Sequence, residues 1–384
     1  SRANISLSNT HIYAGNVDID ASVDNLIMME DRDPDGSLSG YSPLNSENTG
    51  WGEILAILDD FSMIVGVANT STAASVVVDE QSLIVADNFS ADAVNLATAK
   101  AKPGGFYFAA AVAELDAETS VEMDGGLFVA GNATIYAKTQ ATLIATAKVE
   151  TRNAAAVAVG VSTSNTKATY AVGDFGYVGG DLVVQADQID KFSVIANASP
   201  LQVNSPLALS IAVALESSES YAEVVGDRSS SQLVVGGNFT VQADLESLKN
   251  DDGLGMTSKS DSGNGLGKKV KRPLQPAENA YNVYSGNAAE VAVAILDSKF
   301  PKNDKSVPKV QLAAAVGLHD DINHATAVLA DDSAMDINVG GDVVVNANVN
   351  AKPTLRVLSE AESDTKAAVS TQPPSATASG NSQQ

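Results

Sequence analysis

The chain has 384 residues and no cysteine, and its 23 basic and 47 acidic side chains give it a formal net charge of −24. The lack of cysteine excludes disulfides, a thiol nucleophile and cysteine-ligated zinc. The negative charge argues against nucleic acid or anionic lipid as a partner. No apolar stretch reaches the roughly 18 residues that a membrane helix needs, so no membrane span is expected.

A nine-residue element recurs six times. It consists of an apolar residue, two small residues (with Asp87 as the exception), Asn or Asp, four further positions and an alanine. Its copies start at Tyr13, Val85, Val129, Val178, Val235 and Val339. Self-similarity of this kind is typical of repeat architectures, in which each unit buries its apolar face by stacking on the next.

Each copy alternates with a period of two. Leu182, Val184 and Ala186 fall on one face of their segment, while Gln185 and Asp187 fall on the other. This alternation, bounded by Gly, Asn and Asp, indicates strands and turns. We therefore expect an all-β fold, a parallel β-solenoid or β-helix of about six units of roughly 50 residues each, with loop insertions and one short helix.

The Asn/Asp position of the element predicts a corner between strands. Short polar side chains tolerate unusual φ and bond to the local backbone. In stacked coils these residues should form one structural turn column, consisting of Asn16, Asn88, Asn132, Asp181, Asn238 and Asp342. Three of the asparagines begin glycosylation sequons, but their interchange with Asp favours turn chemistry over glycan attachment.

Changes in composition divide the chain into six segments. They are a first solenoid unit (1–24), an insertion with an Asp-rich loop and the short helix (25–61), regular solenoid repeats (62–248), a Gly/Ser/Lys-rich exposed loop (249–276), further solenoid repeats (277–362), and a disordered tail or linker (363–384). The helix is predicted by apolar residues at helical spacing between Trp51 and Phe61. Because the chain starts at Ser1 without a signal-like segment, we expect a processed chain or a piece of a longer one.

The insertion at 25–61 contains the best local candidate for chemistry. Asp31, Asp33 and Asp35 alternate before Gly36, as in the first half of a calcium loop, where carboxylate oxygens converge and Gly permits a sharp turn. The twelfth position of an EF-hand needs Glu, and here it is Ser42. Calcium is the candidate cofactor, and a plain acidic turn is the alternative.

Two other polar clusters have competing interpretations. The loop at 249–276 concentrates lysines, which indicates either a solvated loop or a contact for an acidic surface or polysaccharide. The segment His319–His324 holds two imidazoles and two carboxylates that could bind a transition metal. Its alignment with Ser162–Asn165 and Glu216–Glu219 favours instead a polar turn of the repeat.

The alternating units resemble the β-strand repeats of very large secreted filamentous adhesins of Gram-negative bacteria, including the leukotoxin-type filamentous adhesins. The likeness is carried by AVAVGVSTSNTKATYAVGDFGYVGGDLVVQAD and covers about Ser62 to Leu248 well and Ala288 to Ala351 less well. It implies a parallel β-solenoid on a cell surface or in an extracellular fibre. It brings no catalytic residues.

These observations predict a structural function. We expect a repeat segment of an extracellular adhesin, fibre or surface-layer protein that acts by self-association or attachment to a glycan or cell surface, and not an enzyme. A solenoid's end exposes unpaired strand edges that favour end-on pairing. The alternative is a glycan-binding module or a polysaccharide-active β-helix enzyme, which would need paired carboxylates in a groove with aromatic platforms.

Overall fold

The structure, a computed structural model, describes ten stretches of the chain. They are residues 1–29, 63–105, 108–149, 154–198, 207–226, 231–249, 256–262, 312–329, 335–352 and 355–361. Every regular element in these stretches is a β-strand, and every strand pairing is parallel. The described part of the chain is therefore all-β with parallel sheets. It contains no helix with the length and hydropathy needed to cross a membrane.

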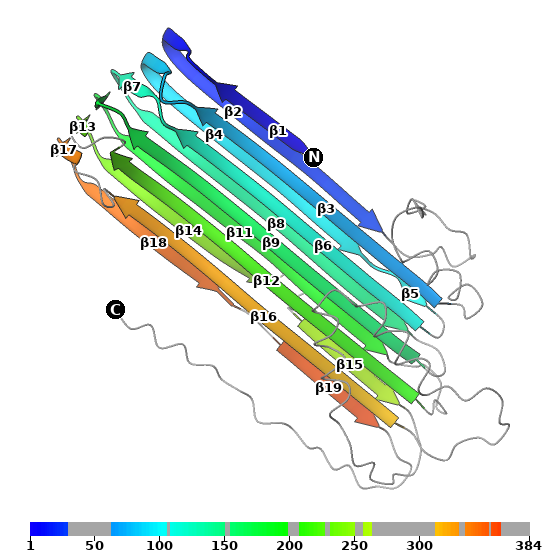
Figure 1. Ribbon diagram of the computed structural model, residues 1–384. Coiled ribbons are helices and arrows are strands. Elements are labelled where there is room, and N and C mark those ends of the chain that lie inside the picture. The colour runs from blue at the N-terminus through cyan, green and yellow to red at the C-terminus, as the bar shows by residue number, and fades with distance from the viewer. Residues whose placement is uncertain are drawn as a thin grey trace, which may run out of the picture.

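One sheet has six strands, one from each repeat, in chain order. They are β1 (Arg2–Leu7), β3 (Met63–Val78), β6 (Phe108–Met123), β9 (Ala154–Val172), β12 (Leu207–Gly226) and β16 (Leu312–Leu329). Their order follows the colour gradient across Figure 1, from blue β1 to orange β16. The Ala/Val runs of the sequence form the first halves of the five strands that follow β1.

The second sheet, called the large sheet here, has thirteen strands. They are β2 (His11–Met29), β4 (Leu83–Ala101), β5 (Gly104–Gly105), β7 (Gly126–Val129), β8 (Ala133–Val149), β10 (Phe175–Val178), β11 (Leu182–Ala198), β13 (Ser231–Val235), β14 (Phe239–Lys249), β15 (Met256–Ser262), β17 (Met335–Val339), β18 (Val343–Ala351) and β19 (Leu355–Ala361). The long strand β4 pairs with β7 by its first half and with β8 by its second. Pairs such as β7 and β8 are thus one long strand interrupted at the nine-residue element.

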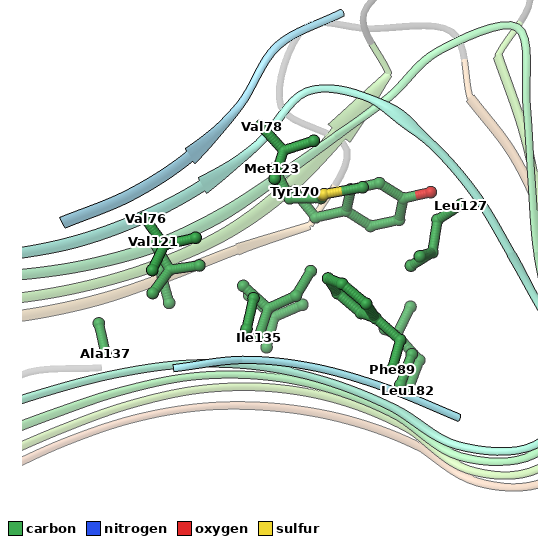
Figure 2. Packing of buried hydrophobic residues seen from close by; sticks show 14 of the residues in the cluster. Val76, Val78, Phe89, Val121, Met123, Leu127, Ile135, Ala137, Tyr170 and Leu182 are labelled. Carbon is green, nitrogen blue, oxygen red and sulfur yellow. The ribbon is translucent and has the colours of Figure 1, made fainter. Parts of the chain in front are cut away.

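The hydrophobic core lies between the two sheets. In Figure 2, Val76, Val121 and Met123 of the six-stranded sheet face Ile135 and Phe89 of the large sheet. Alternate residues point inward along each strand, and most of the buried ones are Ala or Val. Small side chains suit this interior because they fill a thin space between sheets without leaving voids.

The structure contradicts some of the expectations from the sequence and confirms others. The expected polar turns at Ser162–Asn165, Glu216–Glu219 and His319–His324 are wrong, because these segments lie inside strands β9, β12 and β16. Their alignment with one another is correct, since the strand register pairs Ser162 with Glu216 and Glu216 with Asp321.

The expected loop at 249–276 is also interrupted by a strand. β15 pairs with Val194–Ala198, the part of β11 that extends beyond its pairing with β14. The expected helix near Trp51 lies outside the described residues, as do the tail at 363–384 and nearly all of the insertion at 25–61, of which β2 includes residues 25–29.

Candidate functional site

Five of the six residues of the turn column, from Asn88 to Asp342, form a ladder of side chain to backbone hydrogen bonds. Oδ1 of Asn88 accepts from the backbone N–H of Asn132 at 3.2 Å, and Oδ1 of Asn132 accepts from the N–H of Asp181 at 2.9 Å. The series continues from Asp181 to Asn238 at 2.7 Å and from Asn238 to Asp342 at 3.0 Å. At the N-terminal end, Asn88 Nδ2 donates to Asn16 Oδ1 at 3.1 Å. One oxygen per unit thus joins successive units at this corner.

The corner does not use the unusual φ that the sequence suggested. Among the described residues, the non-glycine residue with positive φ is Asn9, at 48°, and it is not in the column. The Asn and Asp residues are selected here for their side-chain oxygen. Because both residue types carry that oxygen, the exchange of Asn for Asp along the column preserves the ladder.

Glycine precedes four of the ladder residues, Asn132, Asp181, Asn238 and Asp342, because there is no room for a side chain at those positions. A Cβ on Gly180 would overlap Asn132 Oδ1 and lie 2.9 Å from the backbone of Gly131, and a Cβ on Gly237 would meet Asp181 and Gly180 in the same way. Real Cβ atoms do not approach backbone atoms this closely. The two small positions of the repeat thus let successive corners lie in contact.

A band of buried polar side chains crosses the core and separates two apolar clusters. We call it the polar seam; its members are Thr70, Thr72, Asn95, Thr119, Thr139, Ser162, Ser164, Thr166, Gln188, Asp190, Glu216, Ser218, Ser220 and Ser247. The hydroxyl of Thr139 lies 2.6 Å from those of Thr119 and Thr166, so the seam is hydrogen-bonded from unit to unit. Thr166 donates onward to Gln188, and Gln188 donates to Asp190 at 2.5 Å.

Toward the C-terminal units the seam becomes acidic. Glu216 of β12 and Asp321 of β16 are register partners, and His319 lies two residues before Asp321 on the same inward face. Ligand atoms from these three residues all lie within 4.8 Å of one another. Asp190 of β11 lies on the opposite sheet, and its Oδ1 accepts a hydrogen bond at 2.9 Å from Ser164 of β9 in the six-stranded sheet. We call Glu216, His319 and Asp321 the acid–imidazole cluster.

Burial shifts the ionisation of these groups. Desolvation raises the pKa of Glu216 to about 8, and the charges of Asp190 and Asp321 add to this shift. Desolvation likewise raises the pKa of Asp190 to about 6, against hydrogen bonds from Ser218, Ser164 and Gln188 that lower it. It lowers the pKa of His319, which favours the neutral imidazole. Taking carboxylates out of water disfavours their charged form, and no cationic group is among the causes of these shifts.

The structure thus divides the two imidazoles and two carboxylates of His319–His324. His319 and Asp321 pair with residues that point into the core, whereas Asp320 and His324 alternate with them on the outer face. Sequence reasoning grouped all four and missed Glu216, which lies far away in the chain. The signal was present in the alignment of the repeats, because Glu216 and Asp321 occupy the same repeat position. The calcium candidates Asp31, Asp33 and Asp35 lie outside the described residues.

A surface groove of about 450 Å³ lies on the large sheet, next to the start of the nine-residue elements in the first four units. Tyr13, Val85, Phe128 and Tyr177 occupy equivalent positions in successive units and line it in a row. Tyr13 and Tyr177 are exposed, and Phe128 packs against Phe175 with ring centroids 5.6 Å apart. Aromatic side chains in a row offer flat apolar faces with polar edges.

The last unit leaves core residues open at the C-terminal end of the stack. Val343 and Val345 of β18 pair with the inward residues Phe239 and Val241 of β14. Phe239 and Val241 are fully buried, but Val343 is 50% exposed and Val345 is 45% exposed. We call Val343, Val345 and Val349 the end face. The hydrophobic interior is therefore open to solvent at this end of the described strands.

Comparison with known proteins gives no relative from which to transfer a function. No family model matches the chain, and neither curated proteins nor solved structures match it.

Proposed function

We propose that the chain is a segment of a parallel β-solenoid whose function is structural, within an extracellular adhesin, fibre or surface layer. The observation that carries this proposal is the ladder from Asn88 to Asp342, in which equivalent residues of successive units make the same contact. Each unit adds one strand to the six-stranded sheet and one interrupted strand to the large sheet. A chain that winds in this way makes a stiff body whose length grows with the number of units.

The open end favours association as the mode of action. Terminal strands of a sheet present unpaired N–H and C=O groups that template further strands. At the C-terminal end these edges surround the apolar end face, so a further unit would bury apolar side chains as well as pair backbone. The ligand of this association is another coil, from a second copy or from an adjoining segment of a longer chain.

Electron microscopy and analytical ultracentrifugation of the intact chain test this proposal. The expected result is elongated particles that associate end to end as concentration rises, with no release of sugar from a polysaccharide panel. Compact particles that stay monomeric at all concentrations would argue against assembly. Sugar release abolished by one carboxylate substitution would establish the polysaccharide-active enzyme instead.

Glycan binding is the second candidate function, and the row of aromatics in the surface groove favours it. Stacking of sugar rings on exposed Tyr13 and Tyr177 is the expected mode of contact. A glycan array probed with the wild type, Tyr177→Ala and Tyr221→Ala tests it, since Tyr221 lies on the six-stranded sheet. Glycan signals that Tyr177→Ala removes and Tyr221→Ala keeps would support this function. Signals that both variants keep would place glycan binding elsewhere.

A further inference from the structure

We propose that the acid–imidazole cluster binds a divalent first-row transition-metal ion, with Zn²⁺ as its representative. One imidazole nitrogen of His319 and one carboxylate oxygen each of Glu216 and Asp321 would be the protein ligands. The proposal is independent of the structural function above, because it concerns a site between the sheets.

The first observation is the convergence of ligand atoms. They lie within 4.8 Å of one another. In tetrahedral geometry, two ligands bonded to one zinc ion at about 2.1 Å are about 3.4 Å apart. The ligand atoms would therefore need to approach one another by at most about 1.4 Å when the ion binds.

The second observation is an unpartnered carboxylate oxygen facing the same space. Asp190 is only 2% exposed, and its Oδ2 has no hydrogen-bond partner in the described structure. Ser164, which donates to Asp190 Oδ1, lies 3.3 Å from the hydroxyl of Ser218, and Ser218 is two residues after Glu216 on β12. A buried charge without a partner is costly, and buried carboxylates ordinarily pair with a cation or coordinate a metal. Nε2 of His319 is buried without a partner as well.

The donor set selects the class of ion. Calcium takes six to eight oxygen ligands and magnesium retains several waters, whereas imidazole suits zinc and other first-row transition ions. Two carboxylates and a neutral imidazole balance a charge of two. Asp190, on the opposite sheet, adds negative potential without being one of the three ligands.

Neighbouring side chains hold the ligands in place. Ser247 donates to Glu216 Oε1 at 3.2 Å, and Asn323 donates to Asp321 Oδ1. The ring of Phe192 stacks on the imidazole of His319 with centroids 6.1 Å apart and planes 3° from parallel. Supporting contacts of this kind orient metal ligands. An ion here would join β12 to β16 and so fasten the last described strand of the six-stranded sheet to its neighbour.

The test uses the intact chain stripped of metal with a chelator and titrated with Zn²⁺ by calorimetry. The inward variants are Glu216→Gln, His319→Gln and Asp321→Asn. The matched controls are Asp320→Asn and His324→Gln, which change the same residue types on the outer face of the same strand. Circular dichroism establishes that each variant folds, and Co²⁺ absorption reports nitrogen ligation independently of heat.

The expected result is one Zn²⁺ site whose affinity falls roughly ten-fold or more in each inward variant and changes less than about two-fold in the controls. Zn²⁺ should raise the thermal midpoint of the wild type and of the controls, and Co²⁺ should give a visible spectrum that His319→Gln alters. Equal Zn²⁺ binding in Asp321→Asn and the controls, or no binding by the wild type, would overturn the proposal. A Ca²⁺ response that matches that of Zn²⁺ would overturn the choice of ion.

Discussion

At the scale of single residues, the column of Asn and Asp shows how an exchange in sequence can leave structure unchanged. Asp181 uses Oδ1 as an acceptor for the N–H of Asn238, and an asparagine in its place would present the same atom. The formal charge is incidental to this contact. The column therefore requires a side-chain oxygen bonded to Cγ, three bonds from Cα, which both Asn and Asp provide.

We expect Asp181→Asn to keep the free energy of unfolding and Asp181→Ala to lower it. The alanine variant leaves the Asn238 N–H to water, and a typical hydrogen bond contributes about 0.5–1.5 kcal/mol net. Urea unfolding of both variants and the wild type measures the difference. Equal loss of stability in the two variants would mean that the charge, and not the acceptor, supports the corner.

Close approach of the corners gives a second prediction at this scale. Gly180→Ala should destabilise the protein by about 1–3 kcal/mol, because its Cβ meets the backbone of Gly131 and the fixed oxygen of Asn132. Gly173→Ala is the matched control, since a Cβ there meets nothing within 4 Å. That control should be neutral or stabilising by up to about 1 kcal/mol. Thermal midpoints that fall equally in both variants would contradict the steric explanation.

The repeat predicts where these residues lie, but it does not predict why Asn, Asp and Gly are needed there. The sequence places Asn16, Asn88 and their equivalents in one register because each begins an alternating run. It suggests φ as the reason, since Asn and Gly are common where φ is positive. Glycine is needed at position 180 because neighbouring units lie in close contact there. That contact depends on the distance between neighbouring strands, which the sequence does not show.

At the scale of elements, the main difference between expectation and structure is the polar seam. Ser, Thr and Asn between two apolar runs ordinarily indicate a turn. Here the strands β9 and β12 continue through such segments, because polar side chains from both sheets satisfy one another inside the core. A sequence read one segment at a time cannot show partners that lie on another strand. The five residues Ser162–Thr166 are all polar, so their sequence shows no alternation that would reveal a strand.

The polar seam makes its central threonine sensitive to loss of its hydroxyl. Thr139→Val keeps the shape of the side chain but leaves Thr119 and Thr166 without that partner, so we expect a loss of about 1–3 kcal/mol. Thr139→Ser keeps the oxygen and should lose less. Chemical unfolding of the two variants gives the comparison. A valine variant as stable as the wild type would mean that the seam adds nothing to stability.

At the scale of the whole molecule, the strands repeat in order across both sheets, and the repeat period anticipated this arrangement. Stacking buries Phe239 and Val241 completely while it leaves Val343 and Val345 half-exposed. The first unit is different, since Val17 and Ile19 of β2 are less than a tenth exposed. The two ends of the described stack therefore differ in how far their core residues are exposed. The sequence alone does not predict which end is the more exposed, because equivalent residues occur in every unit.

This asymmetry predicts which substitutions block end-on association. Val345→Lys places a charge on the end face, where an added unit would bury it without a partner, so we expect the association constant to fall by ten-fold or more, on the order of 1.4 kcal/mol. Val344→Lys is the matched control, because Val344 is also 45% exposed but alternates to the outer face of the same strand. Both variants change the net charge equally, so nonspecific electrostatic effects cancel. Sedimentation velocity over a range of concentrations separates them, and equal association by Val345→Lys and Val344→Lys would show that the end face is not where the molecules meet.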